Sequence, residues 1–204
     1  MRTTTTLVLC LMLPGLHAQT GPGGVGDSAT NMLWFDAAKG VMLNGAFVSA
    51  WADQSGNTNT ASQPAADRQP EYLPDLVNGY PMLQFDNDAS APDHLIVPAQ
   101  PRLEGMGAMT GFCVYRLSDG TPIGVARGIL NKLDPGSDGG SYAWYITSEG
   151  DAPAQHQHFA MGAEGAGLVA GGPAIGAGTH VNGFVFDGAP PSDATDRILY
   201  DGNT

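Results

Sequence analysis

The sequence predicts an all-β fold, an antiparallel β-sandwich, and three observations lead to this prediction. The chain of 204 residues contains 29 Gly and 15 Pro, which interrupt regular structure throughout. Of its 20 acidic residues only four are Glu, which leaves sixteen Asp, and Asp favours turns whereas Glu favours helices. No segment carries apolar residues at helical spacing with caps, while short alternating segments recur along the chain.

The N-terminal half is expected to hold short strands joined by polar loops. In the segment from Phe47 to Asp53, Phe47, Ser49 and Trp51 alternate with a second set of residues, so two faces are predicted. Three prolines favour a long loop over Gln63–Asn78. The other elements expected here are a strand at Asn31–Asp36, a turn at Ala37–Gly40, and strands at Met82–Asp86 and His94–Val97.

The C-terminal half contains the clearest strand pattern, Gly111–Ser118. Phe112, Val114 and Arg116 should point to one side of this strand, and Cys113, Tyr115 and Leu117 to the other. The low-complexity segment Gly162–Gly178 is expected to be a loop around one short strand. Further strands are predicted at Gly128–Leu133, Ser141–Thr147, His156–Met161, His180–Asp187 and Arg197–Tyr200.

Residues 1–18 are predicted to be a signal peptide. Arg2 supplies its positive charge, Leu7–Leu13 its apolar core and Ala18 a small residue before the cleavage point, so the mature chain should begin near Gln19. The apolar core is too short to span a bilayer, and we therefore expect secretion without membrane insertion. The alternative is an ordinary buried N-terminal strand. Residues 19–30 are expected to form a flexible lead-in to a single domain over residues 31–204.

Charge and cysteine content limit the possible binding partners and exclude an intramolecular disulfide. The formal net charge of −12 argues against nucleic acid and anionic membrane surfaces as partners, because both require clustered Lys and Arg. A neutral polysaccharide or a cell-surface glycan fits better. Cys113 is the only cysteine after the leader, so no intramolecular disulfide is expected and this residue should act as a small buried hydrophobe.

Two motifs carry a family resemblance. The pattern W-x-D-x-S-G-N-x-N-x-A begins at Trp51, and N-G-x-P-x-L-x-F-D begins at Asn78. Together they resemble the laminin-G-like (concanavalin A-like lectin/glucanase) jelly-roll domains of secreted bacterial proteins. The resemblance implies a jelly-roll sandwich that is incomplete at its C-terminus, because at least two further strands follow in the family. It also implies a glycan-binding or adhesion module.

Catalytic patterns do not accompany this resemblance. Some jelly-roll glycanases hold their carboxylates on one strand as E-x-D-x-x-E, and this sequence has no such triplet. It has no G-x-S-x-G motif either. The sequence therefore favours a secreted non-catalytic glycan-binding module. The alternatives are a polysaccharide hydrolase or lyase on the same scaffold, and a spacer domain without a ligand.

Two aromatic residues are the candidate carbohydrate platform. Tyr142 and Trp144 share one face of a predicted strand, and sugars stack their apolar faces on exposed aromatic rings. The alternative for this pair is packing in the core, which is also the expectation for the other strand aromatics: Trp34, Trp51, Phe85, Phe112 and Phe184.

The segment DQSGNTN is the candidate metal site. Asp53, Asn57 and Asn59 supply side-chain oxygens around the turn at Gly56, and Ca²⁺ prefers oxygen ligands of this kind. The resembled family sometimes holds a structural calcium near the rim of the sandwich. An Asx-turn network, in which these side chains bond to the local backbone, is the alternative.

Overall fold

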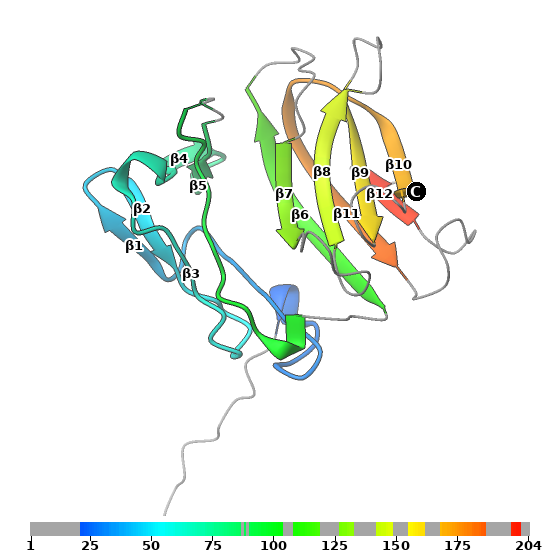
Figure 1. Ribbon diagram of the computed structural model, residues 1–204, viewed down its shortest axis with the longest axis horizontal. Helices are drawn as coiled ribbons and strands as arrows, with labels where there is room; N and C mark the ends of the chain where they lie inside the picture. The colour runs from blue at the N-terminus through cyan, green and yellow to red at the C-terminus, as the bar shows by residue number, and fades with distance from the viewer. Residues whose placement is uncertain are drawn as a thin grey trace, which may run out of the picture.

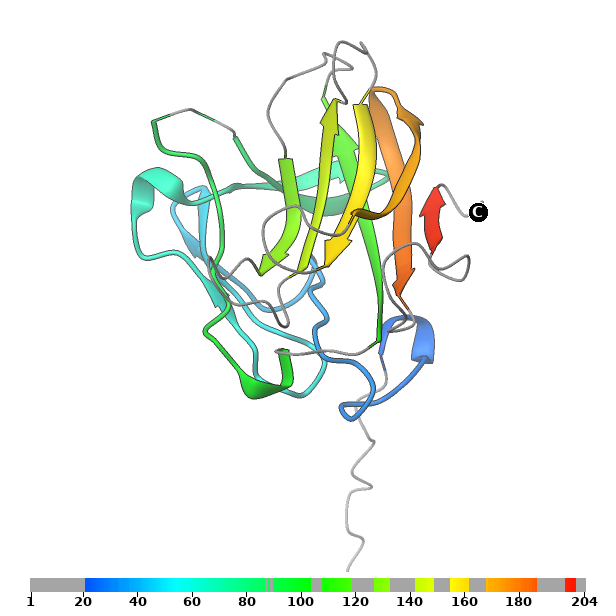
Figure 2. The same ribbon diagram turned by 45° about the vertical axis from the view of Figure 1, so that its right-hand side comes forward.

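The structure, a computed structural model, has an all-β fold, as the sequence predicts. Most of the regular secondary structure is β-strand, and the strand pairing is antiparallel. The N-terminal strands lie on one side of the molecule and the later strands on the other (Figures 1 and 2). The structure describes residues 21–86, 88, 90–103, 108–118, 127–132, 142–148, 155–161, 168–186 and 197–200. Helical elements in this part of the chain are the 3₁₀ turns Pro22–Gly24, Ala66–Arg68 and Pro101–Leu103.

The first sheet, called here the N-terminal sheet, is built from hairpins. Its order is β1 (Val41–Asn44), β2 (Phe47–Trp51), β4 (Glu71–Val77) and β5 (Tyr80–Gln84), with the short β3 (Ala61–Ser62) paired to β2. In β2, Val48 and Ala50 face the interior, as the alternation predicts.

Both two-residue hairpin loops of this sheet use glycine for a positive φ. Gly45 at the β1–β2 turn has φ 66°, and Ala46 beside it stays in the negative region, as a type II′ turn requires. At the β4–β5 turn both Asn78 (φ 52°) and Gly79 (φ 79°) are positive, as a type I′ turn requires. These loops fix the register of the sheet.

The later strands form two more sheets. One, called the β8 sheet, has the order β10 (Leu168–Ile175), β9 (Gln155–Met161), β8 (Tyr142–Ser148) and β7 (Arg127–Lys132). The other, called the β11 sheet, has the order β12 (Arg197–Tyr200), β11 (Gly178–Phe186) and β6 (Met109–Leu117).

The β8 and β11 sheets pack against each other through apolar side chains. Trp144 of β8 contacts Phe184 of β11 edge to face, with ring centroids 5.1 Å apart. A second cluster joins Ile146 of β8 to Leu117 of β6 and Ile175 of β10. Such burial is the main source of stability in folds of this kind. The side chains in the two clusters that are less than a tenth exposed are Leu117, Tyr142, Trp144, Ile146, Ile175, Phe184 and Phe186.

The alternation of β6 is confirmed. Cys113, Tyr115 and Leu117 face the interior, whereas Phe112, Val114 and Arg116 are exposed. Cys113 packs beside the Trp144 cluster, and burial raises the pKa of its thiol to about 12. The expectation that Phe112 and Phe85 belong to the core is wrong, because these rings are 69% and 49% exposed.

Three expected elements of the N-terminal half differ from the structure. Asn31–Asp36 is irregular rather than a strand. The expected loop Gln63–Asn78 contains β4, with Pro74 placed where the pairing with β5 shifts register. His94–Val97 contributes a single bridge, from Ile96 to Ser62, in place of a strand.

The predicted signal peptide lies outside the described residues. Of the expected lead-in, residues 21–30 carry turn structure: the Asp27 carboxylate accepts hydrogen bonds from the backbone N–H groups of Ala29 and Thr30, and the Arg102 guanidinium donates to the Ser28 carbonyl. Among the described residues, no helix is long and apolar enough to cross a bilayer.

Candidate functional site

The predicted sugar platform, Tyr142 and Trp144, lies in the core. Tyr142 is 3% exposed and Trp144 is 2% exposed, so neither ring offers a free face to a sugar. The expectation of a stacking platform here is corrected: the inward face of β8 that places both rings together also aims them at β11. Burial accordingly raises the pKa of the Tyr142 hydroxyl. The core alternative is the one that the structure supports.

The predicted calcium ligand Asp53 forms the centre of a hydrogen-bond network. Its Oδ1 accepts from the backbone N–H of Trp34 and of Ser55, both at 2.9 Å. Its Oδ2 accepts from the Ser55 hydroxyl at 2.7 Å and from the Asn59 N–H at 3.1 Å. Both carboxylate oxygens are therefore engaged by donors of the chain, which is the arrangement of the Asx-turn alternative.

The two predicted asparagine ligands bind the preceding segment of the chain. The Asn57 amide donates to the Asn31 carbonyl at 2.7 Å, and the Asn59 amide donates to the Met32 carbonyl at 2.9 Å. The Asn57 oxygen accepts from the Arg102 guanidinium at 2.8 Å, so a cation of the chain itself already lies against it. Calcium binding at this loop stays a prediction from the sequence.

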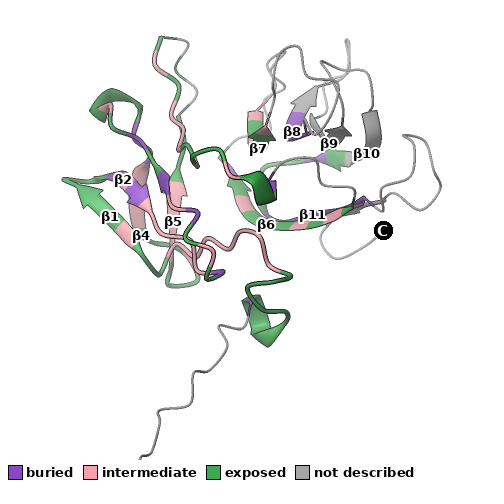
Figure 3. Cartoon of the chain, turned by 60° about the horizontal axis from the view of Figure 1, so that its bottom comes forward, coloured by how far each residue is buried: buried purple, intermediate pink, exposed green. Residues whose placement is uncertain are grey.

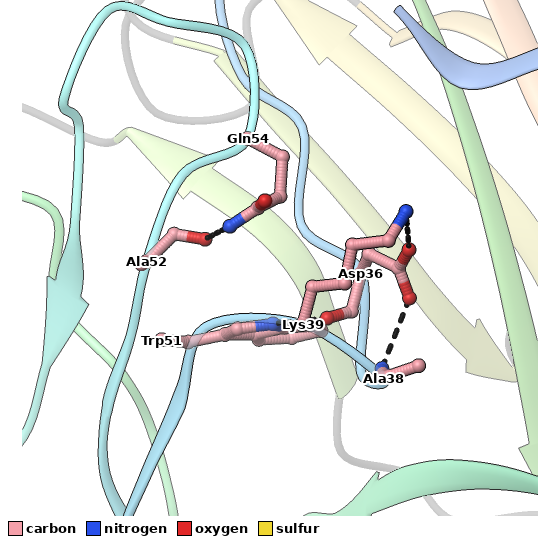
Figure 4. A network of polar contacts seen from close by, with 6 residues as sticks. All are labelled: Asp36, Ala38, Lys39, Trp51, Ala52 and Gln54. Atoms are coloured by element: carbon pink, nitrogen blue, oxygen red, sulfur yellow. Dashed lines mark hydrogen bonds and ion pairs between the residues drawn. The ribbon is translucent and has the colours of Figure 1, made fainter.

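A second polar network anchors the same segment to β2 (Figure 4). The Trp51 indole donates to the Asp36 carbonyl at 3.0 Å, and the Asp36 carboxylate contacts the Lys39 ammonium at 2.9 Å. Partial burial would raise the pKa of Asp36, but hydrogen bonds from Lys39 and from the Ala38 N–H outweigh it and hold this pKa below its usual value. These contacts fix the segment against β2.

A groove over the N-terminal sheet is the strongest candidate for a binding site. Phe47 of β2 lies directly opposite Glu71 of β4, and Glu71 lies opposite Gln84 of β5. Because directly paired residues point to the same face of a sheet, these side chains form one row across three strands. The row lines a groove of about 270 Å³ in which Phe47 is 46% exposed.

The groove walls come from two loops. The turn before β4 supplies Asp67 and Gln69, and the loop after β5 supplies Asp86, Asp88 and Asp93. The loop is closed by two hydrogen bonds: the Asp86 N–H donates to the Asp93 carboxylate at 2.8 Å, and the Asp93 N–H to the Asp86 carbonyl at 2.9 Å. Hydrogen bonds from the Ser90 backbone and hydroxyl lower the pKa of Asp88, so it is ionised at neutral pH.

Buried amides hold the first of these walls in place. The Gln69 amide donates to the Gln63 carbonyl at 2.7 Å, and its oxygen accepts from Asn44 at 3.1 Å. The Gln63 amide lies 2.8 Å from His94 Nε2. Both Gln side chains are 4% exposed. Satisfied buried amides of this kind rigidify a loop, so this wall of the groove is preformed.

A second cavity, of about 230 Å³, differs in character. It lies between β7 and the segment that follows β5, and its lining is mostly aliphatic, including Leu95, Leu103 and Ile129. With few convergent polar groups it gives a hydroxyl-rich ligand little to bind. The groove at Phe47 combines one aromatic ring with seven carboxylate or amide side chains: Asp67, Gln69, Glu71, Gln84, Asp86, Asp88 and Asp93.

In comparisons with family models, with curated proteins and with solved structures, none matched this chain.

Proposed function

We propose that this chain is an exported, non-catalytic glycan-binding module on a β-sandwich of the jelly-roll type. The observation that supports the proposal is the groove over the N-terminal sheet. An exposed aromatic ring beside planar carboxylate and amide groups matches a sugar, which has an apolar ring face and a rim of hydroxyls. Phe47 would stack the ring face, while Glu71 and Gln84 accept or donate hydrogen bonds at the rim.

The charge of the groove selects among glycans. Five of its lining side chains are carboxylic acids, and its lining contains no Lys or Arg. Acidic polysaccharides should be rejected by like charge, whereas neutral glycans and those with amino sugars are compatible. The volume of about 270 Å³ is small for a ligand pocket, so the groove holds one sugar unit and leaves the rest of a chain in solvent.

Binding to a panel of neutral, amino-sugar and acidic polysaccharides tests the proposal. Phe47→Ala should weaken binding about tenfold or more, taking the roughly 1–3 kcal/mol of base–aromatic stacking as a guide. Tyr80→Ala is the matched control, because Tyr80 belongs to the same sheet, is 70% exposed and does not line the groove. Equal binding by both variants, or no binding by the wild type, would overturn the proposal.

A turnover assay on the same panel separates the enzymatic alternative. Several carboxylates share the groove, and a pair of them is what glycoside hydrolysis requires. Release of reducing ends that is lost in Glu71→Gln would assign the hydrolase function instead. We expect binding without release.

A further inference from the structure

Strand β6 forms an edge of the β11 sheet. Among the described residues, β11 is its single strand neighbour. The two strands pair without interruption over nine residues, from Met109 opposite Phe186 to Leu117 opposite Gly178. A long and regular edge of this kind presents a row of backbone N–H and C=O groups to which another strand can add.

The other edge strands carry the features that prevent such pairing. Natural sheets protect their edges with short strands, proline, charged ends and bulges. Here β1 and β12 have four residues each, β7 begins with Arg127 and ends with Lys132, and β5 and β10 contain Pro81 and Pro173. The pairings of β1, β5, β7 and β10 also shift register, whereas that of β6 does not.

The outward face beside this edge is apolar. Phe112 is 69% exposed and Val114 is 59% exposed on β6, and Val181 on β11 is 50% exposed. Figure 3 shows exposed positions along β6. Val114 lies opposite Val181, and Phe112 lies opposite Gly183. A Cβ atom at Gly183 would come within 2.8 Å of the Phe112 ring, so the glycine leaves room for this ring beside β11. The result is a continuous apolar stripe next to an open edge.

Charge indicates which partner can reach this surface. The chain has a net charge of −12, yet neither β6 nor β11 contains Asp or Glu, and Arg116 is the one Lys or Arg in the two strands. Two copies of the acidic protein therefore meet least repulsion where these strands face each other.

We propose that two copies of this chain pair through β6, antiparallel and about a two-fold axis near Cys113. In that register Phe112 of one copy lies opposite Val114 of the second, and by symmetry the contact occurs twice. Thr110 lies opposite Arg116. Aromatic and β-branched residues opposite each other stabilise antiparallel pairs. The two β11 sheets then become one continuous sheet, closed by symmetry.

Light scattering after size exclusion, over a range of concentrations, tests the pairing. We expect a dimer for the wild type and at least tenfold weaker association for Val114→Lys, which adds a charge at an exposed edge position. Leu43→Lys is the matched control: Leu43 is 51% exposed on β1, in a different sheet, and its variant should stay dimeric. Circular dichroism checks that each variant is folded.

Arg116→Glu serves if Val114→Lys fails to fold, because it places a carboxylate at the same edge without touching the interior. A wild type that is monomeric at every concentration overturns the proposal. So does a dimer that a folded Val114→Lys or Arg116→Glu variant leaves intact.

Oxidative cross-linking tests the register. Directly opposed residues have Cα atoms about 4.5–5.5 Å apart, which suits a disulfide. Cys113 itself lies opposite Cys113 of the second copy in this register, so both variants are made in a Cys113→Ala background. There the double variant Phe112→Cys, Val114→Cys should form covalent dimers. Thr110→Cys is the control, because its two thiols would be about 20 Å apart, six residues along the strand pair. No covalent dimer of the double variant, or as much in the control, would overturn the Cys113-centred register.

Discussion

The two halves of this molecule fill their interiors differently. Between the β8 and β11 sheets the interior is mostly made of large apolar side chains, with Trp144 and Phe184 at its centre, and Asn182 and His180 of β11 are the buried polar residues among those described there. Behind the N-terminal sheet the apolar contribution is small, and the largest side chains buried there besides Val48, Pro70 and Leu103 are polar. Those polar side chains are Ser55, Asn59, Gln63 and Gln69, each at most 4% exposed.

This difference changes how each half responds to mutation. An apolar interior depends on volume, and its neighbours relax partly around a smaller side chain. The stability of a polar interior depends on every hydrogen-bond partner being present. A buried donor or acceptor that loses its partner costs the full free energy of its desolvation. The N-terminal half should therefore be sensitive to the loss of single atoms, and the C-terminal half to the loss of whole side chains.

The largest effect is expected for Trp144→Ala. The ring is 2% exposed and packs on Phe184, so its removal should lower the free energy of unfolding by about 3–5 kcal/mol. Urea denaturation measures this change. A folded Trp144→Ala variant of wild-type stability that has lost glycan binding would restore the surface platform that the sequence predicts.

Trp144→Phe is the informative control. The indole N–H is buried and has no hydrogen-bond partner among the described residues. Phenylalanine loses part of the volume but also removes this unpaired donor, which costs about 1–3 kcal/mol in a buried site. We therefore expect Trp144→Phe to stay within about 1 kcal/mol of the wild type.

Asp53→Ala tests the polar half. It removes fewer atoms than Trp144→Ala, but the expected loss of unfolding free energy is nearly as large. It removes four hydrogen bonds, to Trp34, Asn59 and twice to Ser55, and leaves their donors in partly buried positions. The free energy of unfolding should fall by about 3 kcal/mol. Asp75→Ala, at an exposed position of β4, is the control and should change stability by less than about 0.5 kcal/mol. Equal effects would contradict a polar interior.

The sequence predicts the apolar half better than the polar half, for a physical reason. Alternation along β6 reports burial directly, since period-two burial is what a packed sheet produces. Asn31–Asp36 has the same apolar appearance but is not a strand. Its backbone is bonded to side chains of the 53–59 loop, and no local pattern encodes contacts across 19 to 27 residues.

The groove shows what a short pattern does not reveal. Phe47, Glu71 and Gln84 meet only through the pairing of three strands, so their proximity depends on register. The pair Asn78-Gly79 is a type I′ turn signal that locates the β4–β5 hairpin from the sequence, and Gly45 before Ala46 suits the type II′ turn between β1 and β2. Pro74 favours a loop in the sequence where the structure has β4. A proline is tolerated at a register shift, and this shift is known only once the pairing with β5 is seen.

A smaller effect of opposite sign is expected at Thr58. Its φ of 59° places a β-branched residue in the left-handed region, within the loop that organises the polar half. Thr58→Asn keeps a polar side chain and suits this backbone, so the free energy of unfolding should rise by about 1 kcal/mol. Thr60→Asn, two residues on, has no positive φ to relieve and is the control. A loss of stability in Thr58→Asn would show that the hydroxyl has a role that the structure does not reveal.

The smallest effect is expected from calcium. A cation that binds the folded chain alone at a hundredfold excess over its Kd would add about 2.7 kcal/mol of stability, enough to shift the melting temperature visibly. At the 53–59 loop both oxygens of Asp53 already accept from the chain, and Arg102 contacts the Asn57 oxygen. Calcium would have to displace these donors, so we expect equal melting temperatures in calcium and in chelator. If calcium instead raises the melting temperature of the wild type but not that of Asp53→Ala, the loop is the metal site that the sequence predicts. The stability of the polar half would then depend on a bound ion.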